Sequence, residues 1–412
     1  MLQLRMPESR NERIYLLGTI ALLCGLLVNV LLASTSRNDL DIFLAAAREL
    51  LNGGDPYAVK YHEWYTYYYS IFFALLVSPL LPLGALGAKL VWGALTILLV
   101  FRCAKLLGVT GPRLAFFALL ALFQPIRDNI NASQMTVLVV WACIEALHQV
   151  AHGRRTWAAI LIGAAIDVKL IPLVLLPYLI YRRQWRVALL AILVTVTLTF
   201  APALVLGWSH NLDLLASRWA LVDPADPRHV LDVEEPSIIS LGSLLSGYLS
   251  SAPGNDHALD LPRHFADLDI STLTTLLWLG RLLLVMLALY FLRWPPFRTA
   301  RSPEQAQWEV AYLLLCAVLI FPHQRNYSMF LAAPAVVWLV TSSVKSGRAS
   351  WPWWVLCVVA YFGLNAELWI GGFAEIFAHY KMKSLIVLLL IGMLMARRPV
   401  QTVPTLAEPN QQ

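Results

Sequence analysis

Two carboxylates, Asp39 and Asp41, stand shortly after the first long apolar run of the chain. One interpretation is helix capping, in which Asn38 or Asp39 accepts hydrogen bonds at the start of a helix over 40–51 that Gly53 ends. The other is catalysis, because a carboxylate in a partly dehydrated pocket can take a proton from an attacking hydroxyl. One residue can do both, and the pattern alone leaves the alternatives open.

Four side chains further along could bind an anion such as a phosphate. Lys169 follows Asp167 near the end of an apolar run, and it could contact a phosphate, reach the membrane interface or pair with Asp167. Arg325 and Arg127 are competing cations that could equally anchor helix ends. His323 could donate a hydrogen bond to phosphate, assist proton transfer or serve the structure.

Polar amides and a long polar segment complete the candidates. Asn129, Asn131 and Gln134 could bind sugar hydroxyls, or finish a turn and cap the next helix. The acids and histidines of 207–270 fit no strong ligand spacing, so no metal site is predicted there. We expect solvated loop charge in that segment.

The composition is that of a polytopic membrane protein. Of 412 residues, 59% are hydrophobic and only 14% charged, and the mean hydropathy is +0.65. The net charge of +6 lies in short basic clusters between apolar runs, where it sets orientation, so nucleic acid is not an expected partner. All five cysteines fall in or beside apolar runs and are expected to be buried thiols.

Apolar runs predict an all-α bundle of about 12 transmembrane helices, since a span needs about 20 such residues. The candidate runs lie near 14–34, 87–106, 114–126, 134–151, 156–168, 171–182, 187–206, 271–292, 308–322, 327–344, 351–370 and 384–396. The run 67–82 is interrupted by Pro79 and Pro82, and leaving it outside the membrane puts the basic clusters on the cytoplasmic side. This predicts both termini in the cytoplasm and 35–86 as a first outer loop with juxtamembrane helices.

The same order of membrane crossings predicts that the unusual polar residues gather on the outer face. It places there the acids of the first loop, the turn 127–134, Lys169, the loop 207–270, residues 323–326 and residues 379–381. Within 207–270, amphipathic helices are expected at 212–222 and 238–249, with a turn at 253–256, as in a lid. The inner links carry no nucleotide-binding motif. Residues 1–400 are predicted to form a single domain, and the polar tail 401–412 to be disordered in the cytoplasm.

Motifs spread over residues 14–345 carry a family resemblance. They are Asp39-Leu40-Asp41-Ile42-Phe43, Ala46-Ala47, Leu50, Gly53-Gly54-Asp55-Pro56-Tyr57, the Tyr-rich 67–82, Asn131…Gln134, Gly163…Lys169…Pro172 before Arg182-Arg183-Gln184-Trp185-Arg186, and Pro236-Ser237-Ile238 before Leu244-Leu245. Together they resemble glycosyltransferase family 87 (the domain-of-unknown-function 2029 group), GT-C class membrane enzymes that use polyprenyl-phosphate sugars.

The resemblance implies an inverting hexosyltransferase, mannosyltransferase-like, of the cell envelope. Asp39 is the implied base, with Asp41 in reserve, and Lys169, Arg325, His323 and Arg127 are the candidates to bind the donor phosphate. Asn131, Gln134, Tyr57 and Tyr69 are the candidates for sugar or acceptor contacts. No cofactor is firmly implied, although related GT-C enzymes leave a divalent metal ion open.

Other functions remain open from the sequence. A lipid or glycolipid flippase is one, although the polar residues gather at the outer face rather than at the bilayer midplane. An O-antigen ligase or polymerase is another, although the loop 207–270 is acidic. A non-catalytic assembly protein is a third.

Overall fold

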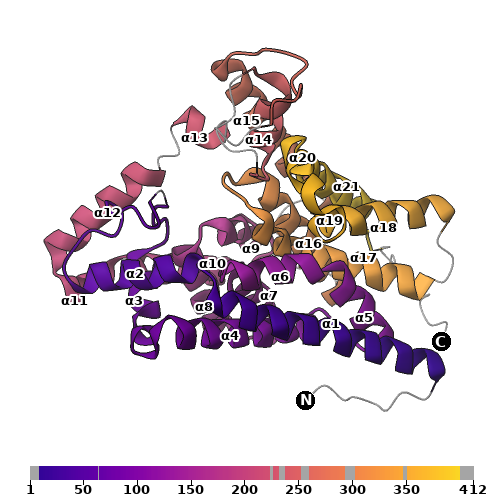
Figure 1. The fold of residues 1–412 in the computed structure, drawn as a ribbon, viewed down its shortest axis with the longest axis horizontal. Coiled ribbons are helices and arrows are strands. Elements are labelled where there is room, and N and C mark those ends of the chain that lie inside the picture. The colour runs from indigo at the N-terminus through magenta and orange to yellow at the C-terminus, as the bar shows by residue number, and fades with distance from the viewer. Residues whose placement is uncertain are drawn as a thin grey trace, which may run out of the picture.

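The chain is built from helices, as the apolar runs predict. The computed structural model describes residues 9–63, 65–222, 226–231, 237–251, 259–292, 302–346 and 350–399 (Figure 1). Within them the only extended pairing is an isolated bridge between Tyr61 and Tyr65, and there is no β-strand. The predicted all-α class is therefore confirmed for the described residues.

The helices follow one another closely. The first half of the chain contains α1 (Arg10–Thr35), α2 (Asp39–Leu51), α3 (Ile71–Val77), η1 (Ser78–Leu83), α4 (Gly84–Leu106), α5 (Pro112–Ala121), α6 (Phe123–Asn131), α7 (Thr136–Ala151), α8 (Arg155–Val168), η2 (Ile171–Val174), α9 (Leu175–Tyr181), α10 (Trp185–Phe200) and α11 (Ala203–Leu206). The second half contains α12 (Trp208–Val222), α13 (Pro227–Leu231), α14 (Leu241–Leu249), α15 (Ile270–Leu292), α16 (Pro303–Ile320), η3 (Asn326–Ala332), α17 (Ala333–Ser346), α18 (Trp351–Leu364), α19 (Ala366–Ile370), η4 (Gly371–Phe373), α20 (Ala374–His379) and α21 (Met382–Ala396).

Fewer helices than predicted are long enough to cross a membrane. Five described segments are long and apolar enough, at 10–35, 71–106, 185–206, 270–292 and 326–344, and a sixth exists if α18 to α20 count as one span. The predicted count of about 12 is not confirmed. Several expected spans are short helices: the run 114–126 is divided between α5 and α6, and α21 covers its run with only 15 residues.

The first loop forms helices that lie against each other. α2 packs against α3 and η1, which holds Pro79 and Pro82. Phe43 of α2 and Phe73 of α3 are fully buried in this cluster, with ring centroids 5.3 Å apart. In Figure 1, α12 lies next to α2, and its Leu214 is buried in the same core. Helices are thus present in the segment 35–86, and α3 runs on into α4 through η1, so that 71–106 is one of the segments long enough to cross a membrane. The placement of 35–86 on the outer face stays a prediction.

Close helix packing fixes the position of α8. A Cβ atom on Gly163 would lie 2.6 Å from the carbonyl oxygen of Ala191 in α10, so the two backbones nearly touch. Thr195 Oγ1 also donates a hydrogen bond of 3.1 Å to the Gly163 carbonyl. Small residues allow such approach between helices in membranes. This contact holds α8 against α10, and α8 ends at Val168, directly before Lys169.

The segments predicted for the outer face do meet. The backbone N–H of Asp39 donates to the carbonyl of Ala132 at 3.1 Å, and that of Ile239 donates to the carbonyl of Gln324 at 2.6 Å. The amphipathic helices expected near 212–222 and 238–249 are present as α12 and α14. Their action as a lid and the membrane side of this end stay predictions. The predicted turn at 253–256 and the tail 401–412 lie outside the described residues.

Candidate active site

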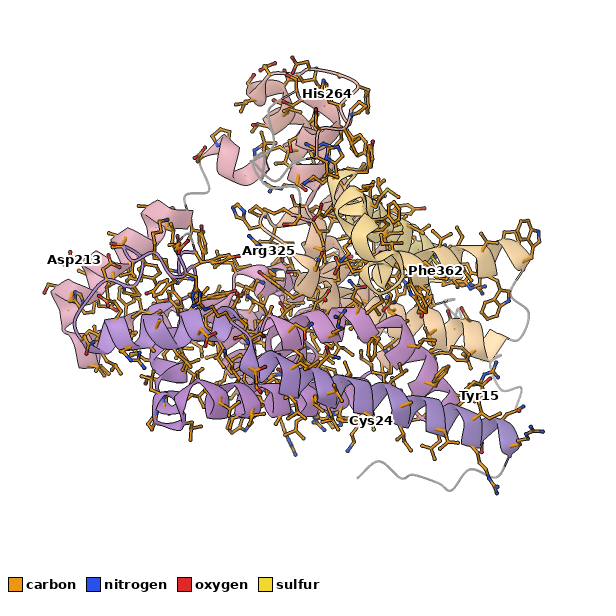
Figure 2. All side chains as sticks on the ribbon, in the orientation of Figure 1. Tyr15, Cys24, Asp213, His264, Arg325 and Phe362 are labelled. Carbon is orange, nitrogen blue, oxygen red and sulfur yellow. The ribbon has the colours of Figure 1, made fainter. Side chains whose placement is uncertain are left out.

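A cavity of about 420 Å³ lies where these segments meet. Such a volume is typical of a pocket for a small ligand. Figure 2 labels Arg325 on its wall, near the centre of the molecule between α2 and the C-terminal helices. The lining residues come from α2, the segment 65–69, α6 with its following turn, and residues 237 and 325–327. They are Asp39, Ile42, Phe43, Tyr65, Thr66, Tyr67, Tyr68, Tyr69, Asp128, Asn131, Ala132, Gln134, Ser237, Arg325, Asn326 and Tyr327.

Asp39 is the first residue of α2 and faces this cavity. Gln134 Nε2 donates a short hydrogen bond to its Oδ2 atom. Burial raises the pKa of Asp39, while the Gln134 hydrogen bond and the charges of Arg325 and Lys169 act in the opposite direction. Asp39 is thus a half-buried carboxylate, held by one amide and increased in basicity by its surroundings.

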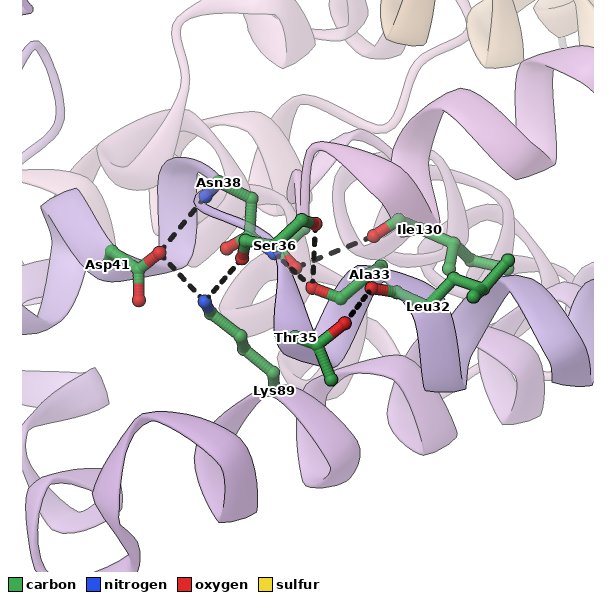
Figure 3. Close-up of polar contacts among 9 residues, drawn as sticks. Leu32, Ala33, Thr35, Ser36, Asn38, Asp41, Lys89 and Ile130 are labelled. Carbon is green, nitrogen blue, oxygen red and sulfur yellow. Dashed lines mark hydrogen bonds and ion pairs between the residues drawn. The ribbon is translucent and has the colours of Figure 1, made fainter.

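Asp41 has a different environment, although only one residue separates it from Asp39. Its Oδ2 accepts a hydrogen bond of 3.0 Å from the backbone N–H of Asn38 and lies 2.8 Å from Lys89 Nζ (Figure 3). Lys89 also donates to the carbonyl of Ser36 at 2.7 Å. Asp41 does not line the cavity. Its contacts fasten the start of α2 to α4, with Asn38 as the N-cap residue.

Two tyrosines predicted to contact sugar or acceptor form a chain of hydrogen bonds behind Asp39. The hydroxyl of Tyr69 donates to Gln134 Oε1 at 3.0 Å, which fixes the orientation of the amide toward Asp39. The hydroxyl of Tyr57 donates to the carbonyl of Tyr69 at 2.7 Å. Tyr69 lines the cavity, whereas Tyr57 is buried outside its lining. Tyr57 therefore supports the wall.

Lys169 directly follows α8 and is not among the residues that line the cavity, although its neighbour Tyr327 is. Its ammonium lies 5.1 Å from the ring centroid of Tyr327, and within the described part of the chain it makes no hydrogen bond or ion pair. The expected alternative of pairing with Asp167 is wrong, because Ser70 Oγ donates to Asp167 Oδ2 at 2.6 Å instead. Burial lowers the pKa of Lys169 to about 8, against the attraction of Asp39.

The other predicted cations divide between the cavity and the surface. Arg325 lines the cavity, and its charge acts on Asp39. His323 is exposed at a backbone φ of 57° and does not line the cavity. Arg127 Nε donates to Asn29 Oδ1 of α1 at 3.2 Å, also outside the lining. Of these three predicted phosphate ligands, the structure brings Arg325 alone into the cavity wall.

Several lining residues were not among the predicted site residues. Asn131, which was predicted, lines the cavity together with Asp128, one helical turn earlier on the same face of α6. Burial raises the pKa of Asp128 to about 6, with Lys383 opposing this shift. The spacing of Asp128 and Asn131 was a visible signal in the sequence. Tyr68 belongs to the Tyr-rich segment 67–82 of the family resemblance, whereas the position of Tyr65 carried no comparable signal.

A second polar network braces the far wall of the cavity. Glu367 of α19 accepts hydrogen bonds from Asn326 Nδ2 at 2.6 Å and from Gln124 Nε2 at 2.6 Å. Lys383 of α21 lies 2.7 Å from the same carboxylate. This network attaches the C-terminal helices to α6 and η3, and no predicted site residue belongs to it.

Two acids, Asp39 and Asp128, line the cavity. Among the residues that the structure describes, no three His, Cys, Asp or Glu side chains gather where they could hold a metal. Asp232, Glu234 and Glu235, acids of the segment 207–270, lie outside the described residues.

Comparison with protein families places most of the chain in a known family. Residues 67–322 match the sequence model of glycosyltransferase family 87. The matched range holds eight of the sixteen cavity residues, while Asp39 precedes it and Arg325 follows it. Comparisons with curated proteins and with solved structures give no significant match.

Proposed function

The chain belongs to glycosyltransferase family 87 and is a membrane glycosyltransferase, and on that premise we propose a specific reaction. A mannose-like hexose passes from a polyprenyl-phosphate donor to a hydroxyl group of a lipid or glycan acceptor. The transfer takes place on the outer face of the cytoplasmic membrane with inversion at the anomeric carbon. Both chain termini lie in the cytoplasm.

In the proposed reaction Asp39 is the general base. Its carboxylate takes the proton of the acceptor hydroxyl, whose oxygen forms a bond to the anomeric carbon of the donor sugar. The bond between that carbon and the phosphate oxygen breaks, and the polyprenyl phosphate leaves with the electron pair. No step of this reaction passes through a metal ion.

The position of Asp39 carries the proposal. It lies in the cavity wall with its carboxylate oriented by Gln134, and burial makes it a stronger base than an exposed aspartate. Asp41, the reserve candidate, is occupied by Lys89 and the helix cap. Two acids of the same type therefore have separable roles.

Positive charge near the cavity supports the leaving group. Lys169 and Arg325 both act on Asp39 through their charges, so each lies within electrostatic reach of the reaction centre. Cations placed where negative charge develops stabilise a transition state more strongly in a dehydrated site than in water. Lys169 is the proposed phosphate ligand, because it has no protein anion bound to it among the described residues.

Turnover in lipid tests the proposal. Protein purified into nanodiscs is incubated with polyprenyl-phosphate hexoses and candidate acceptors, with Asp39→Asn compared to its matched control Asp41→Asn. We expect Asp39→Asn to lose roughly 10²–10⁴-fold in transfer, and Asp41→Asn to keep its rate per folded molecule. Donor that stays unconsumed while a labelled lipid moves between leaflets would show a flippase. Full activity in Asp39→Asn would show that another group is the base.

A further inference from the structure

Two tyrosines present their surfaces to the cavity rather than to the core. Tyr65 and Tyr68 are 45% and 49% exposed, and both line the cavity. Their neighbour Tyr67 is fully buried. The segment is held in shape, since Tyr61 and Tyr65 exchange backbone hydrogen bonds of 2.7 and 2.8 Å. These hydrogen bonds hold the backbone that carries the exposed ring of Tyr65 in one conformation.

Asp128 on the same cavity wall has unused hydrogen-bonding capacity. Within the described part of the chain its carboxylate accepts one hydrogen bond, from Gln124 Nε2 at 3.5 Å, and forms no ion pair. An ionised carboxylate has about four acceptor sites. Its pKa of about 6 leaves Asp128 mostly ionised at neutral pH. The amide of Asn131, one turn further along α6, faces the same cavity.

An aromatic face beside a carboxylate matches the chemistry of a pyranose ring. One face of such a ring presents C–H groups with partial positive charge, which are attracted to the negative face of an aromatic ring. The rim of the pyranose carries hydroxyl groups, which donate to carboxylates. Different cations act on the two acids of the cavity: Lys169 and Arg325 act on Asp39, and Lys383 and Arg127 act on Asp128.

We propose that Tyr65, Tyr68 and Asp128 form a subsite for a sugar ring of the acceptor, so that the acceptor is a glycan or glycolipid rather than a simple lipid alcohol. Naming the bound sugar as the acceptor rests on the proposed function. The donor phosphate needs the half-buried cations, whereas the exposed tyrosines suit a ring that enters from water. The subsite holds the acceptor while Asp39 removes its proton.

Binding without turnover tests the subsite directly. Saturation-transfer NMR on the protein in nanodiscs uses methyl hexopyranosides of gluco, manno and galacto configuration as probes. We expect the protein to transfer saturation to the ring C–H protons of at least one probe. This saturation transfer should fall fivefold or more in Tyr65→Ala and Tyr68→Ala and be retained in Tyr68→Phe. Tyr290→Ala is the control, because Tyr290 is 69% exposed on α15 and does not line the cavity. Equal saturation in the wild type and both alanine variants, or none for any probe, would overturn the subsite.

Kinetics then assign the subsite to the acceptor. Losing a hydrogen bond to a charged group costs about tenfold or more, so Asp128→Asn should raise the KM for a glycan acceptor by that factor. The KM for the donor should stay unchanged. A raised donor KM with an unchanged acceptor KM would overturn the acceptor assignment. If the wild-type protein transfers saturation to a hexopyranoside but consumes no donor, the proposed transfer reaction would be refuted, while the sugar subsite would still hold.

Discussion

Lys169 gives the enzyme a charge that is lost within an accessible pH range. Burial lowers its pKa to about 8, so the ammonium is charged below that pH and neutral above it. Roughly 90% of the side chains are charged at pH 7 and about 10% at pH 9, as follows from one pKa unit on either side. If the charged form binds the donor phosphate, kcat/KM for the donor should fall about tenfold between pH 7 and pH 9.

Two substitutions separate this effect from other titrations. Arginine stays protonated throughout, so Lys169→Arg should remove the decline above pH 8. Lys169→Gln removes the charge at every pH and should lower kcat/KM by roughly 10–150-fold, the value of a hydrogen bond to a charged group of about 1.5–3 kcal/mol. Its profile should also be flat above pH 7.

The assay is donor consumption in nanodiscs at subsaturating donor, followed from pH 5 to pH 10. The ratio kcat/KM is measured because it reports the pKa values of the free enzyme. A decline near pH 8 that persists in Lys169→Arg would assign the titration to another group. Wild-type kcat/KM in Lys169→Gln would refute the phosphate role itself.

Three further outcomes follow from contacts around the cavity. Gln134→Leu removes a hydrogen bond that lowers the pKa of Asp39. The acidic limb of the pH profile of kcat/KM should therefore move to higher pH, and a move to lower pH would contradict this. Asp41→Asn should lower the free energy of unfolding by about 1–3 kcal/mol, because the substitution removes the ion pair with Lys89 and weakens the helix cap. Thermal denaturation measures this, and an unchanged melting temperature would contradict it. Gly163→Ala should cost about 1–3 kcal/mol, because its Cβ would lie 2.6 Å from a backbone carbonyl of α10. Gly392→Ala is the matched control, since nothing lies within 4 Å of a Cβ atom there, and equal losses for both would refute the packing argument.

The helical class could be predicted from the apolar runs, but the number of spans could not. The run 351–370 looks continuous, yet the chain bends by 76° between α18 and α20. Asn365 stands at this break, and its Nδ2 donates to the carbonyl of Ala121 at 3.0 Å while its Oδ1 accepts from the backbone N–H of Gln124 at 3.0 Å. One asparagine thus satisfies the free backbone groups of the break between α5 and α6. Such long-range pairing leaves no local trace in the sequence.

Prediction of the site had a similar limit. Capping rules indicated that an acid near the start of α2 would be structural, and family resemblance pointed to Asp39 and Gln134, which lie in contact. Local rules could not tell that Lys169 turns away from Asp167, because that choice depends on Ser70, 97 residues away in the chain. Side chains whose neighbours come from distant segments need the fold itself.

The separation between Asp39 and Asp41 has a practical value. The acid that faces the cavity contributes little to the anchoring of α2, which rests on Asp41, Lys89 and Asn38. An Asp39→Asn protein should therefore keep the wild-type architecture while its substrates stay intact. It would be the form in which donor and acceptor could be captured side by side for imaging by electron microscopy.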